Sequence, residues 1–301
     1  MKRDLISFSL WSRQELTGIF DLAHRLKNER ETHSQTLRGK SAALIFERES
    51  LRTRVSFEVG IAQLGGHPIF LQQQTIGIAT RESVHDIGEV LSHYNELIIA
   101  RTVKHQTLIQ LAEGAGVPVI NAMTDLVHPC QIMADVFTLQ EAGKFSPETK
   151  IVFVGDGNNI VNSWLEFAEK VPITFVYSCP AGYEPHPQIL EQAKASGVSK
   201  IAAEPNPQEA VQGADVLYTD VWPETRGEGR KMNTFREYQV NANLLKGGKS
   251  DCVVMHRLPA NRGEEITSDV LDGERSLVLR QAENRLHVQK GIMLSLLSNG
   301  K

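Results

Sequence analysis

The sequence has few cysteines, and their positions form no pattern. The three cysteines of the chain, Cys130, Cys179 and Cys252, lie far apart with no metal-ligand spacing between them. We therefore expect no disulfide framework and no structural metal site, and we expect the protein to work in a reducing, cytoplasmic compartment.

Long apolar runs and a large excess of either charge are also missing. No apolar run approaches the roughly 20 residues that a membrane-spanning helix needs, and the opening residues lack the apolar stretch of a signal peptide. A formal net charge of -4 provides no bulk attraction to nucleic acid or to an anionic membrane. We therefore expect no membrane or nucleic-acid partner, and any anion site must be built locally.

The chain is long and apolar enough for two domains of ordinary size. It has 301 residues, of which 41% are hydrophobic and 23% charged. Apolar runs that alternate with helical periodicity predict buried strands at 42–46, 97–100, 151–154 and 216–219. This alternation predicts an α/β fold of two doubly wound domains with mostly parallel sheets. We place the domains at 1–140 and 141–284, and we expect a C-terminal helix at about 285–301 to pack back on the first.

Polar residues cluster directly after the predicted strands. In open parallel sheets the carboxyl ends of the strands form the edge where ligands bind. In the first domain this edge would consist of residues 50–54, Arg101 and residues 128–131. In the second it would consist of Asn158, Asn159, Asp220 and residues 256–259. A cleft between the two edges is the predicted active site.

The segment 50–54 places two arginines, a serine and a threonine where a strand turns into a helix. A helix N-terminus offers unpaired N–H groups and a partial positive charge, and arginine forks around it would complete an anion pocket. The segment therefore predicts a phosphate site. The alternative is that Ser50 only caps the helix and that Arg52 and Arg54 are solvated surface residues.

The glycines at 155 and 157 follow a strand and could belong to a dinucleotide fold. However, Ile160 stands where the third glycine of that motif belongs, and Tyr177-Ser178 stands where its acidic residue belongs. A nucleotide-binding function is therefore disfavoured. We expect a tight turn that directs Asn158 and Asn159 towards a small ligand.

Single polar residues at the other strand ends allow two interpretations each. His128 either binds a ligand or is satisfied by the backbone, and Asp220 either binds a substrate ammonium or caps a helix. Arg101 needs an anionic partner if it is buried. Together these residues favour an anionic electrophile on the first domain and an amino acid on the second.

Six short motifs occur in one order along the chain. They are Ser-x-Arg-Thr-Arg at 50–54, His-Pro-x-Gln at 128–131, Gly-Asp-Gly-Asn-Asn at 155–159, Asp-x-Trp at 220–222, His-x-Leu-Pro at 256–259 and Ala-Glu-Asn-Arg at 282–285. By these motifs the chain resembles, over essentially its full length, the aspartate/ornithine carbamoyltransferase superfamily and within it the ornithine branch.

The resemblance implies transfer of a carbamoyl group from carbamoyl phosphate to the δ-amine of L-ornithine, which yields citrulline and phosphate in arginine metabolism. It implies that the first domain binds carbamoyl phosphate and the second the amino acid. It also implies that no metal or organic cofactor is needed, and that the protein is a homotrimer or a multiple of trimers. In such an assembly the loop at 72–83 reaches towards a neighbouring subunit.

The family positions imply a role for each site residue. Carbamoyl phosphate would be bound by Ser50, Leu51, Arg52, Thr53, Arg54, Arg101, His128, Gln131, Leu258 and Arg285. Ornithine would be bound by Asn159, Asp220, Glu224 and Thr225. Catalysis would involve Arg52, Thr53, Arg101, His128 and Arg257. The arginines would neutralise the leaving phosphate, and Thr53 and His128 would donate towards the developing oxyanion.

The chain departs from the ornithine pattern on the acceptor side. Glu224-Thr225 stands where the family has Ser-Met, and Arg257 stands where it has cysteine. Arg257 could lower the pKa of the attacking amine by like-charge repulsion, or it could obstruct a cationic acceptor. We hypothesise that Glu224 and Arg257 form a charge pair when the loop closes.

These departures leave other functions open. One is a carbamoyltransferase that acts on acetylornithine, a diamine or another amino acid. Another is a non-catalytic relative that binds carbamoyl phosphate or an amino acid. The aspartate enzyme is disfavoured, because Ala260 stands where that enzyme has an arginine after His-x-Leu-Pro.

Overall fold

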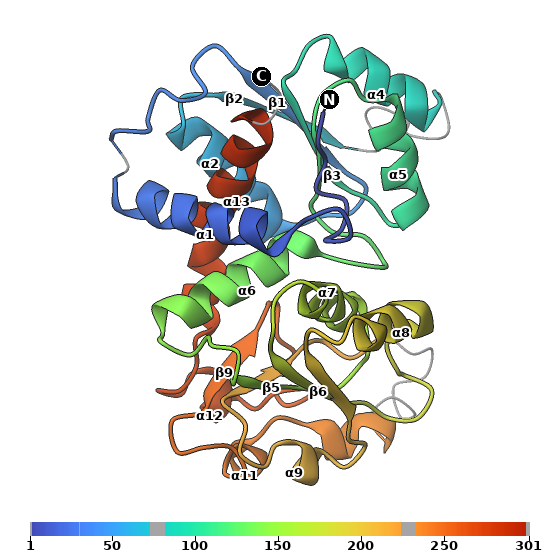
Figure 1. The fold of residues 1–301 in the computed structure, drawn as a ribbon, viewed down its shortest axis with the longest axis vertical. Helices are drawn as coiled ribbons and strands as arrows, with labels where there is room; N and C mark the ends of the chain where they lie inside the picture. Colours follow the sequence, from blue (N-terminus) through green and yellow to red (C-terminus); the bar gives the residue numbers. More distant parts are fainter. Residues whose placement is uncertain (1, 30, 73–81, 224–232, 299–301) are drawn as a thin grey trace. The chain divides into compact units, whose positions relative to one another are not determined.

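The computed structural model describes residues 2–29, 31–72, 82–223 and 233–298 (Figure 1). The chain forms two compact units, one of Met1–Ala134 with Glu283–Lys301 and one of Asp135–Ala282. Both boundaries fall inside helices, namely α6 (Pro129–Glu141) and α13 (Val278–Ser298). None of the described helices is both long enough and apolar enough to cross a membrane.

The first unit is built on a parallel sheet. Its strands are β1 (Ser41–Phe46), β2 (His67–Gln72), β3 (Leu97–Arg101) and β4 (Val119–Asn121). Their order is β2-β1-β3-β4, and every described pair is parallel. The chain therefore adds strands first on one side of β1 and then on the other, which puts the topological switch point between β1 and β3.

Helices connect and cover these strands. They are α1 (Arg13–Asn28), α2 (Leu51–Gln63), α4 (Val84–Ser92) and α5 (His105–Gly114). The C-terminal part of α13 packs in this unit between α1 and α2, as Figure 1 shows. Gly60 of α2 and Gly291 of α13 allow this approach, because a Cβ at Gly291 would lie 3.0 Å from the carbonyl oxygen of Ile19.

The second unit repeats the design with a sheet in the order β7-β6-β5-β8-β9, again parallel in each described pair. Its strands are β5 (Lys150–Val154), β6 (Thr174–Ser178), β7 (Lys200–Ala203), β8 (Val216–Thr219) and β9 (Val253–His256). Its other elements are α7 (Asn159–Ala168), α8 (Pro187–Ala195), α9 (Pro207–Ala210), η1 (Arg236–Tyr238), α11 (Ala242–Leu245) and α12 (Ser268–Leu271). The switch point here lies between β5 and β8.

The central strands of both sheets are buried over nearly their full length. Such continuous burial is expected for parallel strands with helices on both faces, and it accounts for their apolar sequences. In the second unit Trp164 of α7 stacks on Phe175, with ring centroids 6.1 Å apart. The prediction of an α/β fold with two parallel sheets is thus confirmed.

Candidate functional site

The turn after β1 and the end of β3 meet at the switch point of the first unit. In the sheet register Phe46 pairs with Arg101, so the segment after β1 starts beside Arg101. Arg101 Nη1 donates a hydrogen bond to Ser50 Oγ at 3.0 Å. A guanidinium is therefore held at the start of α2, where the helix already favours negative charge.

Ser50 occupies the N-cap position of α2, with an extended backbone, but its side chain makes no capping hydrogen bond. The alternative that Ser50 only caps the helix is therefore wrong, because its hydroxyl oxygen accepts from Arg101 instead. The Leu51 side chain is 73% exposed. Its backbone N–H lies in the first turn of α2, where helical N–H groups lack partners within the helix.

Arg54 of α2 contacts two neighbouring side chains. Its Nε lies 3.0 Å from Glu58 Oε1, and its guanidinium carbon lies 3.4 Å from the centroid of the Phe70 ring. A cavity of about 390 Å³ adjoins this arrangement. The cavity is lined by Glu49, Ser50, Leu51, Arg54, Val55, Glu58, Phe70 and Gln72. Arg54 thus carries a compensated charge at the wall of this cavity.

Thr53 and Arg285 are joined although they are far apart in the sequence. Thr53 is 1% exposed and Arg285, on α13, is 3% exposed. Arg285 Nη2 donates a hydrogen bond to Thr53 Oγ1. This bond ties the C-terminal helix to the first turn of α2, and it fixes the direction of the Thr53 hydroxyl.

His128 and Gln131 lie at the start of α6, after the loop that follows β4. Both side chains are buried, at 1% and 0% exposure. Between them Cys130 is also buried, and burial raises the pKa of its thiol to about 12, although Arg285 opposes the shift. Cys130 is therefore a neutral packing residue, whereas His128 and Gln131 are buried polar side chains at the start of α6.

In the second unit the ends of three adjacent strands bring the acceptor-side motifs together. Val154 pairs with Thr219, and Thr219 pairs with His256. The residues that follow these three positions are Gly155, Asp220 and Arg257, so they emerge side by side at the switch point.

Arg257 and Asp220 form a partly buried ion pair there. Arg257 Nε donates to Asp220 Oδ2 at 2.7 Å, and Asn158 Nδ2 donates to the same oxygen at 2.9 Å. The Asp220 side chain is 1% exposed and that of Arg257 15%. Burial opposes the charge of Arg257, but Asp220 outweighs this effect and raises the pKa of the guanidinium.

These contacts bear on two expectations. Residues 221–223 are not helical, so Asp220 does not cap a helix directly after β8, and its carboxylate accepts from side chains instead. Glu224 and Thr225 lie outside the described residues, so the hypothesis of a Glu224–Arg257 pair stays a prediction. Within the described residues the anionic partner of Arg257 is Asp220.

Asn158 and Asp156 are functional candidates that the family positions did not assign. Asn158 caps α7, because its side chain accepts from Ile160 N at 2.9 Å, and it also holds Asp220. Burial and, second, the nearby Asp220 raise the pKa of Asp156 to about 7. The signal in the sequence was an acidic residue between two glycines at a strand end. Asn159, which follows, is 7% exposed in the first turn of α7.

The turn at 256–259 is fixed by a buried histidine. His256 Nδ1 accepts from Leu258 N at 2.9 Å, so Nε2 carries the proton and donates to Glu265 Oε1 at 3.1 Å. Both side chains are fully buried. Leu258 has φ +61, a conformation that is rare for leucine and that this bond helps to hold. His256 therefore shapes the turn that carries Arg257 and Leu258.

A network of buried polar side chains contacts strands β8 and β9 close to these ends. The Tyr218 hydroxyl donates to Asp135 Oδ2 at 2.9 Å, and Gln281 Nε2 donates to Asp135 Oδ1 at 2.7 Å. Gln281 Oε1 in turn accepts from His256 N at 3.0 Å. Because these residues are distant in the sequence, no local sequence pattern predicts the network.

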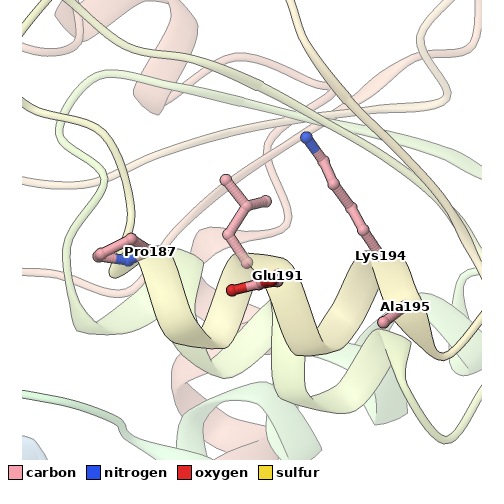
Figure 2. Close-up of a pocket in the computed structure, with 5 residues that line it drawn as sticks. Pro187, Glu191, Lys194 and Ala195 are labelled. Atoms are coloured by element: carbon pink, nitrogen blue, oxygen red, sulfur yellow. The ribbon is translucent and has the colours of Figure 1, made fainter.

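Two surface features lie away from the motif residues. One is a hollow of about 540 Å³ on one face of α8, shown in Figure 2 and lined by Pro187, Leu190, Glu191, Lys194 and Ala195. The other is an exposed cluster on α4, formed by His85, Asp86 and Glu89. Neither contains a residue of the six motifs.

Comparison with known proteins gives full-length matches. Residues 3–141 match the family described as aspartate/ornithine carbamoyltransferase, carbamoyl-P binding domain, and residues 147–296 match the Asp/Orn binding domain of the same family. The chain is 44% identical over 306 residues to the ornithine carbamoyltransferase of Chlorobaculum tepidum, covering 99% of this chain and 90% of that protein. It is 42% identical over 302 residues to that of Geobacter sulfurreducens, covering 99% and 100%.

Solved structures agree with these matches. The ornithine carbamoyltransferase of Thermus thermophilus superposes with a TM-score of 0.90 at 42% identity, covering 99% of both chains. That of Pyrococcus furiosus gives a TM-score of 0.93 at 39% identity, covering 97% of this chain and 96% of that one.

Proposed function

This chain belongs to the aspartate/ornithine carbamoyltransferase family, and we propose that it is an ornithine carbamoyltransferase of arginine biosynthesis. The reaction converts carbamoyl phosphate and L-ornithine to L-citrulline and phosphate. The observation that carries the proposal is the match to curated ornithine carbamoyltransferases at 42–44% identity over nearly the whole chain. The segment 50–54 offers a site for the anionic substrate, and the acceptor-side residues of the second unit offer a site for the amino acid.

We assign carbamoyl phosphate to the first unit. The phosphate would bind at the start of α2, against Ser50, the Leu51 N–H and the guanidinium groups of Arg52 and Arg101. The Arg101–Ser50 hydrogen bond supports this assignment, because it places positive charge at the helix N-terminus before the ligand arrives. Since Arg54 is already paired with Glu58, it would add to the positive field more than it would bind an oxygen.

We assign the carbonyl side of the same ligand to a second group of residues. Thr53 and His128 would donate to the carbonyl oxygen as it becomes an oxyanion, and buried donors aimed at developing charge lower the barrier. Gln131, Leu258 and Arg285 would complete this side. The Arg285–Thr53 bond supports the assignment, because it orients the hydroxyl that the mechanism uses.

The acceptor residues belong to the second unit. Asn159, Asp220, Glu224 and Thr225 would hold ornithine, and Arg257 would act beside the attacking amine. The amine must be neutral to attack, and a nearby cation favours that form. The new bond joins the δ-nitrogen to the carbamoyl carbon while the bond from this carbon to the phosphate oxygen breaks. The departing phosphate takes the proton that the amine loses, and the residues assigned here require no metal or organic cofactor.

We further propose that the protein is cytoplasmic and that it assembles as a homotrimer or a multiple of trimers. The family resemblance implies the assembly and the unpatterned cysteines favour a reducing compartment, and light scattering coupled to size-exclusion chromatography tests the assembly. A monomer at micromolar concentration would contradict it.

An acceptor panel tests the function. The purified protein is incubated with carbamoyl phosphate and ornithine, N-acetylornithine, putrescine or aspartate, and both phosphate and ureido product are measured. We expect citrulline with ornithine and at most traces with the others. A different preferred amine would overturn the acceptor assignment, and no product with any amine would overturn the enzyme assignment.

A further inference from the structure

Glu47, the first residue after β1, contacts the main chain at the end of β3 in two places. Its backbone N–H donates to the carbonyl oxygen of Arg101 at 2.9 Å. Its side-chain Oε2 accepts a hydrogen bond from the backbone N–H of Val103. The two bonds engage the two successive peptide groups that follow the Cα atom of Arg101, so they fix the path of the chain as it leaves the strand.

The side-chain bond continues the contact between the two strands beyond the end of their regular ladder. The last pair of the register is Phe46 with Arg101, and Val103 lies two residues further along the chain. The Glu47 carboxylate takes the place of a strand carbonyl as the acceptor for the N–H of Val103. A charged acceptor makes a shorter and stronger hydrogen bond than a neutral one, so it suits a position where the ladder has ended.

Val103 also joins this contact to the next loop of the same unit. Its carbonyl oxygen accepts from the N–H of Asp125 at 3.1 Å. Asp125 belongs to the loop that leads from β4 to His128. The segments that follow β1, β3 and β4 are therefore linked through Val103, and the carboxylate of Glu47 is the side chain on which this link depends.

The direction of the main chain after Arg101 matters because its side chain acts at a distance from its backbone. Arg101 Nη1 donates to Ser50 Oγ at 3.0 Å, at the start of α2. An arginine side chain is long and has many rotamers, so the position of its guanidinium depends on how the backbone presents it. A displacement of about 1 Å in a binding group can cost up to about 100-fold in rate.

We propose that Glu47 is a positioning residue for the phosphate site: its carboxylate holds the main chain after Arg101 so that the guanidinium reaches the start of α2. In this role Glu47 acts through Arg101 and makes no contact with the phosphate. The proposal rests on the proposed function, which assigns the phosphate of carbamoyl phosphate to this site.

The sign of the effect separates positioning from simple electrostatics. Glu47 carries a negative charge in the segment that leads to an anion site, and like charges repel. If the charge acted only through its field, its removal would tighten phosphate binding. The positioning role predicts the opposite, weaker binding, because the guanidinium loses its fixed direction.

Glu96 provides a matched control at the other end of the same two strands. Its backbone N–H donates to the carbonyl oxygen of Ser41 at 3.0 Å, and its Oε2 accepts from the N–H of Ser41 at 2.7 Å. Glu96 directly precedes β3, and Ser41 is the first residue of β1. Glu47 and Glu96 are both half-buried and both make a carboxylate-to-backbone bond between β1 and β3, so they differ in their distance from the phosphate site.

Isothermal titration with inorganic phosphate tests the proposal without turnover. Glu47→Ala should raise the Kd of phosphate about 10-fold, whereas Glu96→Ala should change it less than about threefold. Both alanine variants should lose thermal stability to a similar extent, because each loses one hydrogen bond to a carboxylate. Glu47→Gln keeps the shape of the side chain and an acceptor oxygen without the charge, so it should fold and raise the Kd about threefold.

Three results of this titration would overturn the proposal. They are unchanged phosphate binding in both Glu47 variants, tighter binding in either of them, and an equal loss of phosphate affinity in Glu96→Ala.

Turnover tests whether the effect passes through Arg101. In Glu47→Ala, kcat/KM for carbamoyl phosphate should fall about 10-fold, while KM for ornithine changes less than about threefold. In an Arg101→Ala background the same substitution should lower kcat/KM less than about threefold further, because the guanidinium that it positions is gone. A full additional loss in that background would overturn the proposal. A wild type that binds phosphate but forms no citrulline would overturn only the proposed function, and the titration of the variants would still decide the role of Glu47.

Discussion

Replacing Asp156 by asparagine should stabilise the protein, and more strongly at pH 8 than at pH 5. Burial and the neighbouring Asp220 raise the pKa of Asp156 from 3.8 to about 7 in the folded protein. In the unfolded chain the carboxyl group ionises near its ordinary pKa, so between the two values the unfolded state holds fewer protons. The wild type therefore loses stability as the pH rises from about 4 to about 7, and it loses no more above that range.

The size of the stability difference depends on how much of the interval between the unfolded and the folded pKa lies between pH 5 and pH 8. From pH 5 to the folded pKa is about two units, and each unit corresponds to about 1.4 kcal/mol, so the difference is up to about 3 kcal/mol. Asparagine has nearly the same shape and does not titrate. Asp156→Asn should therefore gain up to about 3 kcal/mol more at pH 8 than at pH 5.

Urea unfolding, followed by tryptophan fluorescence at both pH values, measures this difference. Trp164 and Trp222 both belong to the second unit and report on it directly. Asp272→Asn is the control, because Arg262 lowers the pKa of Asp272 and that group stays ionised throughout this range. Equal stabilisation of Asp156→Asn at pH 5 and pH 8 would refute the reasoning.

Three further substitutions probe other parts of the site. Thr53→Val removes the proposed oxyanion donor and also the acceptor of the Arg285 hydrogen bond, so kcat/KM for carbamoyl phosphate should fall about 10- to 100-fold and the free energy of unfolding by about 1–3 kcal/mol; unchanged kinetics would contradict the assignment. Tyr218→Phe deprives the buried Asp135 of a donor and should cost about 1–3 kcal/mol in urea unfolding, so a neutral result would contradict the network. Gly157→Ala would place a Cβ 2.4 Å from the backbone nitrogen of Pro185, so the turn must shift and KM for ornithine should rise severalfold; an unaltered KM would show that the turn tolerates the change.

The fold class could be predicted because the signals for it are local. Continuous apolar runs such as 151–154 mark strands that are buried on both faces, and helical periodicity fills the intervals. The edge strand β7 (Lys200–Ala203) escaped prediction, because its exposed residues Lys200, Ala202 and Ala203 show no apolar run or clean alternation.

The residues proposed for the site stay a prediction, whereas the family could be predicted from the order of the six motifs and is confirmed by the full-length matches. The ion pair between Asp220 and Arg257 could not be predicted from the sequence. Asp220 and Arg257 were both expected at strand ends, but only the order β5-β8-β9 and its register make them neighbours. For the same reason the sequence does not predict the pair of Arg257 with Asp220, and the hypothesis of a Glu224–Arg257 pair stays a prediction. Strand order depends on long-range packing, which a single sequence does not display.

The most direct test of the whole account is a product assay with the wild-type protein. Carbamoyl phosphate and L-ornithine are supplied, and citrulline and phosphate are quantified over time. We expect citrulline and the phosphate released above the uncatalysed rate to accumulate in equal amounts, and we expect no citrulline when ornithine is omitted. Release of phosphate without citrulline, or no release above the uncatalysed rate, would contradict it.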